Sequence, residues 1–215
     1  MQLRNVLLVA LVCAAAAFAQ QLTPGLDTPF QVSYAANPSA GESYINIINT
    51  GANGAPLKGP GFGAAVGNMC VNVYAFAPDE QEISCCSCLL TPNSVANLGV
   101  NRDLTSTTLT GVVPTSVVIK LVATLAGSGG SGSSCSNSAA TVAFDNMVYG
   151  MIAYGTTPQP VGTAYNAVSQ AFLPATLSAG ELASITGRCQ AILGNGSGFG
   201  VCKSCRAGAL GATKQ

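Results

Sequence analysis

Apolar and polar residues alternate in short runs over much of the chain, which is the pattern of β-strands with one buried face. The clearest run is 69–76, and the sequence Pro78-Asp79-Glu80-Gln81 separates it from a second run at 82–90. Proline presets the backbone for a turn and aspartate caps it. The two runs therefore predict an antiparallel hairpin. Further strands are predicted at 30–34, 43–49, 103–110, 115–125 and 141–154.

Two of these runs have a composition that predicts their environment. Residues 103–110 are rich in threonine and serine, which predicts an exposed or edge strand. Residues 115–125 are apolar on both faces apart from Lys120, which predicts a strand that is buried on both sides. Three prolines predict irregular chain after the last run: Pro158, Pro160 and Pro174.

The period of the pattern changes near residue 178, where a helix is predicted. Ser178 and Glu181 form a capping box, with leucines at the staple positions on either side. Apolar residues then recur at helical spacing up to Gly194, a natural C-cap. Gly180 and Gly187 weaken this helix by up to about 1 kcal/mol each. We therefore expect it to depend on tertiary packing, with Cys189 on its apolar face as a covalent tie.

Many short strands, long loops and one late helix predict a mainly β fold, a β-sandwich with one C-terminal α-helix. The expected organisation is a signal peptide at 1–19, an extended N-terminal lead at 20–29, a sandwich domain at 30–176 with a flexible Gly/Ser loop at 127–138, and a C-terminal segment at 177–215 whose helix and Cys-x-x-Cys motif pack on the sandwich.

The first nineteen residues predict export. Arg4 precedes an apolar run at 6–17, and Ala17-Phe18-Ala19 is the small-x-small pattern that signal peptidase recognises. The run is too short and too rich in alanine for a typical membrane span, so an uncleaved anchor is the weaker alternative. We expect a mature chain that starts near Gln20 and has no membrane span. The expected location is secreted, extracellular or at the cell surface, with the periplasm as an alternative.

Charged residues make up only 7% of the chain, and hydrophobic residues make up 48%. The hydrophobic content predicts a folded chain. Without Arg4 the chain has seven basic and eight acidic residues, a formal net charge of −1. Low charge favours association, so we expect a homo-oligomer or polymer. A cluster of basic residues to engage phosphates is missing, so nucleic acid is not an expected partner.

Eight cysteines remain after the signal segment, an even number that indicates disulfides in an exported chain: Cys70, Cys85, Cys86, Cys88, Cys135, Cys189, Cys202 and Cys205. Neighbours on a strand face opposite sides, so Cys85 and Cys86 need different partners, whereas Cys86 and Cys88 share a side. A turn centred near 79–80 places Cys70 opposite Cys88 or Leu89. Cys70–Cys88 is therefore the favoured pair, and the other pairs stay unassigned. The fold is expected to be a disulfide-stapled sandwich.

Two other uses of the cysteines are weighed against disulfides. Cys202-x-x-Cys205 together with Cys85-Cys86-x-Cys88 offers enough thiolates for a zinc or copper site, although an oxidising compartment removes thiolates. Cys202-x-x-Cys205 also has the spacing of a redox motif, without the βαβ context that activates the thiol. We expect neither a metal nor another cofactor.

Enzymatic activity is not expected, and no residue is predicted to be catalytic. The chain contains no histidine, which excludes Ser-His-Asp and Cys-His catalysis. Asp79, Glu80 and Glu82 are interpreted as a solvated turn, since they lack the pattern of a calcium loop. The glycine-rich residues 195–200 follow a helix, whereas a phosphate-binding loop opens one, so they are interpreted as a turn.

Four strings in the chain stand out: Cys70-Val-Asn-Val-Tyr-Ala-Phe, Cys85-Cys-Ser-Cys-Leu-Leu-Thr-Pro-Asn93, Pro114-Thr-Ser-Val-Val-Ile-Lys120 and Gly196-Ser-Gly-Phe-Gly-Val-Cys-Lys-Ser-Cys205. Together they resemble a group of secreted, cysteine-rich bacterial proteins without an assigned activity. The resemblance implies an exported bacterial protein in which every mature cysteine belongs to the pattern. It carries over no catalytic or binding residue.

The favoured function is a non-enzymatic structural protein, a self-associating subunit of an extracellular filament, surface layer or matrix. The lead at 20–29 is expected to add a strand to the sheet of a neighbouring subunit. The alternative is a surface adhesin or glycan-binding module, by analogy with other β-sandwiches. A metal-binding or redox role for the cysteines ranks third.

Overall fold

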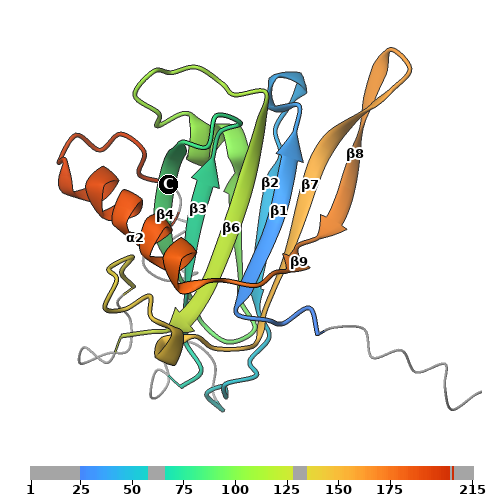
Figure 1. Ribbon diagram of the computed structural model, residues 1–215. Helices are drawn as coiled ribbons and strands as arrows, with labels where there is room; N and C mark the ends of the chain where they lie inside the picture. The colour runs from blue at the N-terminus through green and yellow to red at the C-terminus, as the bar shows by residue number, and fades with distance from the viewer. Residues whose placement is uncertain (1–24, 58–65, 128–134, 204, 206–215) are drawn as a thin grey trace, which may run out of the picture.

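A computed structural model describes residues 25–57, 66–127, 135–203 and 205 (Figure 1). The predicted signal peptide at 1–19 lies outside the described residues, as do the first part of the lead and most of the Gly/Ser loop. Two antiparallel sheets pack face to face, and one helix lies on the outside of the larger sheet. The predicted fold class, a disulfide-stapled β-sandwich with one C-terminal helix, is confirmed.

The larger sheet has five strands in the order β4-β3-β6-β1-β9. The predicted hairpin of residues 69–76 and 82–90 forms one side of this sheet, with the same limits as the sequence pattern. The bounds are β1 (Phe30–Ala36), β3 (Met69–Phe76), β4 (Glu82–Leu90), β6 (Ser116–Leu125) and β9 (Leu173–Pro174). Only β9, two residues long, falls outside the predicted strands of this sheet.

The smaller sheet has four strands in the order β5-β2-β7-β8. They are β2 (Tyr44–Asn49), β5 (Val95–Gly99), β7 (Met151–Val161) and β8 (Ala164–Ala171). Only β2 matches its prediction. Residues 141–150, predicted as strand, instead form turns and the short helix η3 (Phe144–Asn146). Only the last four residues of the predicted strand, 151–154, belong to β7.

The prediction of an irregular chain around Pro158 and Pro160 is wrong, because both residues lie inside β7. Strand β2 ends its pairing with β7 at Thr156, so the prolines lie beyond the reach of β2. The Pro158 carbonyl accepts a hydrogen bond from Asn37 on that same side. The missing proline N–H groups therefore face away from β8, and the β7–β8 ladder is preserved.

The prediction of a strand at 103–110 is also wrong. Residues 100–105 form one π-helical turn, η2 (Val100–Thr105), and irregular chain follows. Serine and threonine hydroxyls bond to nearby carbonyls, with Ser106 Oγ donating to Arg102 O at 2.6 Å and Thr108 Oγ1 to Thr105 O at 2.9 Å. These local bonds compete with a strand ladder. Another short helix, η1 (Pro38–Ala40), joins β1 to β2.

The five-stranded sheet is buried on both faces, which explains why every residue of β3 is buried. Val71 and Val73 face the smaller sheet and join the core between the sheets. Tyr74 and Phe76 face the helix and form a second core. β6 is likewise packed on both sides, as predicted.

Helix α2 (Ala179–Gly194) lies across the outer face of the larger sheet (Figure 1). Ser178 Oγ accepts a hydrogen bond from Glu181 N at 3.1 Å, which is half of the predicted capping box. The Glu181 carboxylate pairs instead with Lys120 of β6. The C-cap is Asn195, one residue beyond the predicted Gly194. Within the described part of the chain, none of the helices has both the length and the apolar character needed to cross a bilayer.

The described part of the lead, residues 25–29, is bound to its own chain. Asp27 O accepts from Gly150 N at 3.0 Å, and Pro29 O accepts from Ala123 N at 2.8 Å. The buried Gln31 side chain donates to Leu26 O at 2.6 Å. These residues are therefore occupied within the subunit, and only 20–24 of the predicted lead lie outside the described residues.

Candidate functional site

Strand β4 carries three cysteines, and each is joined to a segment near the C-terminal end of the described chain. All eight cysteines outside the signal segment form four disulfides: Cys70–Cys135, Cys85–Cys189, Cys86–Cys202 and Cys88–Cys205. The last three attach helix α2 and the Cys-x-x-Cys segment to a single strand. The fold is therefore held by covalent links between elements that are distant in sequence.

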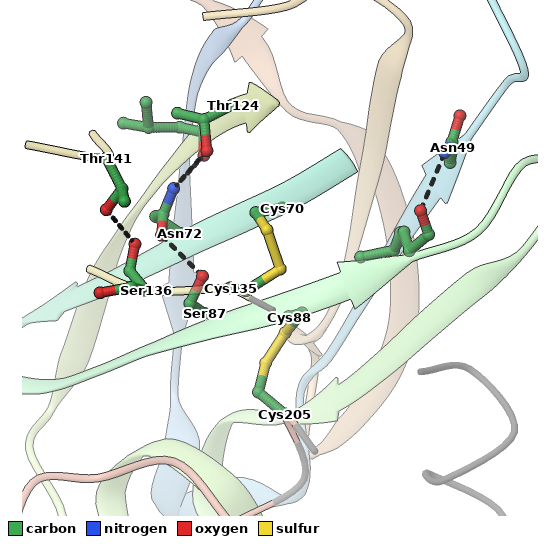
Figure 2. The surroundings of a disulfide bond; sticks show 12 residues. Asn49, Cys70, Asn72, Ser87, Cys88, Thr124, Cys135, Ser136, Thr141 and Cys205 are labelled. Atoms are coloured by element: carbon green, nitrogen blue, oxygen red, sulfur yellow. Dashed lines mark hydrogen bonds between the residues drawn. A yellow bond between two sulfur atoms is a disulfide. The ribbon is translucent and has the colours of Figure 1, made fainter. Parts of the chain in front are cut away.

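The favoured pair Cys70–Cys88 is wrong. Cys70 lies opposite Leu89, and Cys88 lies opposite Val71. Directly opposed residues share a face, so Cys70 and Cys88 point to opposite sides of the sheet. Cys70 is joined to Cys135 on the outer face, and Cys88 is joined to Cys205, as two separate bridges (Figure 2).

Cys85 and Cys86 point to opposite faces of β4, as strand geometry predicted. Cys85 lies in the core beneath α2 and joins Cys189 of that helix. Cys86 lies in the core between the sheets and joins Cys202. Adjacent cysteines thereby secure two different layers of the molecule to one strand.

The glycine-rich segment before Cys202 covers the outer edge of β4. Cys85 N donates to Gly200 O at 2.9 Å, and Val201 forms a parallel bridge with Cys85. Gly200 has φ +74°, and a Cβ atom there would lie 2.8 Å from the Ile192 side chain. This position therefore requires glycine, and the glycine-rich string is part of the packing at the sheet edge.

A buried polar network crosses the outer face of the larger sheet next to Cys70–Cys135 (Figure 2). Asn72 Nδ2 donates to Val122 O at 3.2 Å and to Thr124 Oγ1 at 3.3 Å. Ser87 Oγ donates to Asn72 Oδ1 at 2.8 Å. Asn72 thus links β3 to both neighbouring strands and fixes their register.

Glu82, interpreted from sequence as part of a solvated turn, is buried at its carboxylate group. In the described part of the chain neither carboxylate oxygen has a hydrogen-bond partner, and a carboxylate oxygen lies within 4.8 Å of the sulfurs of Cys85 and Cys189. Burial raises the pKa of Glu82 to about 8, and Arg188 and Lys120 oppose this shift. Burial also raises the pKa of Tyr74, whose hydroxyl likewise has no hydrogen-bond partner among the described residues. Asp79 and Glu80 are exposed, as expected for a turn.

A cleft of about 340 Å³ lies between α2 and the end of the β3–β4 hairpin. Lys120 lines it together with Glu181, its ion-pair partner, and its Nζ atom lies 4.6 Å from the centre of the Phe76 ring. Arg188 donates to the Glu80 carbonyl at 2.7 Å. Lys120 and Glu181 pair with each other and Arg188 bonds to the hairpin backbone, so these side chains dock the helix on the sheet.

Strand β8 lies at the edge of the molecule away from β4 and α2, and it projects from the body together with β7 (Figure 1). It pairs with β7 on one side and is the last strand of its sheet on the other. Seven of its eight residues are exposed, and the sequence between Asp145 and Glu181 contains no charged residue. β8 is therefore an open, uncharged sheet edge, and the sequence pattern did not predict it as a strand.

Five of the six tyrosines in the chain are exposed, and Tyr74 alone is buried. Tyr44, Tyr154 and Tyr165 share the outward face of the smaller sheet, as the registers of β2, β7 and β8 require. On the same face, next to Tyr154, Asn97 Nδ2 of β5 donates to Asn46 Oδ1 of β2 at 2.8 Å. We call this outward surface of β5, β2, β7 and β8 the tyrosine face; none of its strands contains a charged residue.

The chain was compared with protein-family models, with curated proteins and with solved structures, and none of these matches it. The function is therefore argued from the disulfide framework, the open edge and the tyrosine face.

Proposed function

We propose that this chain is an exported, non-enzymatic structural protein whose subunits self-associate into an extracellular filament, surface layer or matrix. The observation that carries the proposal is strand β8, an uncharged edge with solvent on both faces. Soluble proteins usually protect such edges with charges, bulges or covering segments. The opposite edge of the molecule, at β4, is covered by residues 200–202.

A second copy of the chain is the occupant that best suits the β8 edge. Two β8 strands in antiparallel pairing satisfy each other's free backbone groups and form a symmetric contact. The tyrosine face lies next to this contact and supplies a second uncharged surface for growth beyond a dimer. Four disulfides support a location in an oxidising compartment outside the cytoplasm.

The structure changes the role we assign to the N-terminal lead. Residues 25–29 are hydrogen-bonded within the subunit, so cleavage after Ala19 leaves five residues, 20–24, to reach a neighbour. Five extended residues span at most about 18 Å, whereas the eight residues of β8 need about 26 Å. We therefore favour β8–β8 pairing over strand donation by the lead.

The test is the assembly state of the purified mature protein, measured by light scattering on a sizing column and by electron microscopy. Ala167→Lys with Val168→Lys places a charge on each face of β8 and should yield monomers. Val112→Lys with Val113→Lys, in the exposed loop before β6, adds the same charge as a matched control and should assemble like the wild type. Deletion of 20–24 should also leave assembly intact. Wild-type protein that is monomeric at every concentration would refute the proposal.

The tyrosine face favours one alternative, a surface adhesin that binds a neutral glycan. Tyr44 and Tyr154 offer rings for sugars to stack on, and Asn46 and Asn97 offer amide groups for hydroxyls. A glycan array tests this directly. Specific binding by the wild type, lost in Tyr44→Ala with Tyr154→Ala and kept in Tyr34→Ala, would place the adhesin role first.

A further inference from the structure

Two disulfides that join distant segments lie close together between the sheets. Cys86 and Cys88 come from one face of β4, and Cys202 and Cys205 come from the C-terminal segment. The sulfurs of Cys86, Cys88 and Cys205 lie within 4.8 Å of one another, and Cys202 is bonded to Cys86. We call these four residues the sulfur cluster.

The sulfur cluster is shielded from solvent and set apart from the other cysteines. Cys86, Cys88 and Cys202 are each less than 10% exposed and belong to the core between the sheets, and Cys205 packs against that core. Cys85 faces the opposite side of β4, with Cys189. Cys70 and Cys135 form their own bridge on that outer side.

We propose that the sulfur cluster binds one Zn²⁺ ion as a tetrathiolate site when its two disulfides are reduced. Zinc bonds four thiolates tetrahedrally at about 2.3 Å, which places the sulfurs about 3.8 Å apart. Three of the four sulfurs, those of Cys86, Cys88 and Cys205, already lie within 4.8 Å of one another. The fourth, on Cys202, is bonded to Cys86 and becomes available to the ion when that bond opens. The Cys-x-x-Cys spacing of the C-terminal pair is also the spacing of structural zinc sites.

The chemistry balances with a dithiol as the reductant. Two dithiol molecules supply four electrons and four protons, the bonds Cys86–Cys202 and Cys88–Cys205 break, and each dithiol closes to its own disulfide. Zn²⁺ then replaces the four thiol protons, which leave to solvent. The bound site carries a net charge of −2, and Lys203 lies next to one of its ligands in the sequence. Either state fastens the C-terminal segment to β4.

The experiment uses the full mature protein, reduced without oxygen by a phosphine and then supplied with zinc or cobalt chloride. After desalting, elemental analysis should find about one zinc per chain. The cobalt form should show the visible and thiolate charge-transfer bands of a tetrahedral sulfur site. Cys86→Ser with Cys202→Ser should abolish both signals. Cys70→Ser with Cys135→Ser removes the same number of thiols outside the sulfur cluster and should retain both.

Circular dichroism of each sample distinguishes loss of the site from loss of the fold. Reduced protein that keeps its β spectrum and retains no zinc would overturn the proposal. Reduced protein that unfolds and does not refold with zinc would overturn it as well, because a preformed structural site couples binding to folding. Equal zinc content in the two double variants would show that the metal lies elsewhere. None of these outcomes depends on self-association.

Discussion

Glu82 buries a carboxyl group beside the Cys85–Cys189 disulfide, and its environment makes stability depend on pH. The pKa of Glu82 is about 8 in the folded protein, above the ordinary value of 4.5. Between these two pH values the folded state therefore holds a proton that the unfolded state has lost. The stabilising contribution is complete below pH 4.5 and is lost as the pH rises to about 8. The full shift sets an upper limit of about 5 kcal/mol.

We therefore expect Glu82→Gln to be more stable than the wild type at pH 8 and to show a flatter stability profile between pH 5 and pH 8. Glutamine has the shape of the protonated acid and cannot ionise. Urea unfolding of both proteins at several pH values measures the difference. Glu80→Gln, on the exposed turn, is the control and should follow the wild type. A wild-type profile without a downward slope would contradict the burial argument.

Single residues also mark the limit of what the sequence reveals. Asn72 sits in an apolar run, and nothing in its neighbours along the chain indicates that it bonds to Val122 and Ser87. The pair Cys70–Cys88 was mispredicted because a shift of one residue in hairpin register reverses the face. The register contains an irregularity between Ala75 and Phe76, which the turn sequence does not encode.

At the level of elements, strands β3, β4 and β6 and helix α2 could be predicted because their local patterns agree with their final environment. Strand β8 could not, because its exposure on both faces erases the alternation that identifies a strand. Strand β7 was hidden by prolines that are tolerated only beyond the reach of β2. Such features depend on which strand lies alongside, and a local pattern does not carry that information.

Two glycines, Gly187 inside helix α2 and Gly200 in the segment that follows it, should respond to alanine in opposite directions. Gly187 is exposed and a Cβ atom there meets nothing within 4 Å, so Gly187→Ala should stabilise the protein by about 0.5–1 kcal/mol through helix propensity. Gly200→Ala should destabilise it, because φ +74° and the contact with Ile192 exclude a side chain. Thermal unfolding of the two variants and the wild type measures the change in Tm for each substitution. A stabilising effect at Gly200 would contradict the close packing at the β4 edge.

For the whole molecule, the surface proposed for assembly contains no charge, and this sets its response to salt. Screening weakens contacts between ions, whereas burial of apolar surface is not weakened by salt. We therefore expect oligomers to persist, or to grow, between about 0.05 M and 1 M sodium chloride. Sedimentation velocity across this range of salt concentration measures the size of the oligomers. Dissociation at high salt would point to an ionic interface and away from β8.

The direction of synthesis gives the disulfide map a biosynthetic consequence. The partners of Cys85, Cys86 and Cys88 all follow residue 188, so these thiols stay unpaired until that later segment has emerged during synthesis. A fragment that stops earlier displays three reactive sulfurs on a strand whose edge has lost its cover. Chains that stop before residue 189 therefore leave three thiols open to cross-linking, whereas pairing with the later segment buries all three.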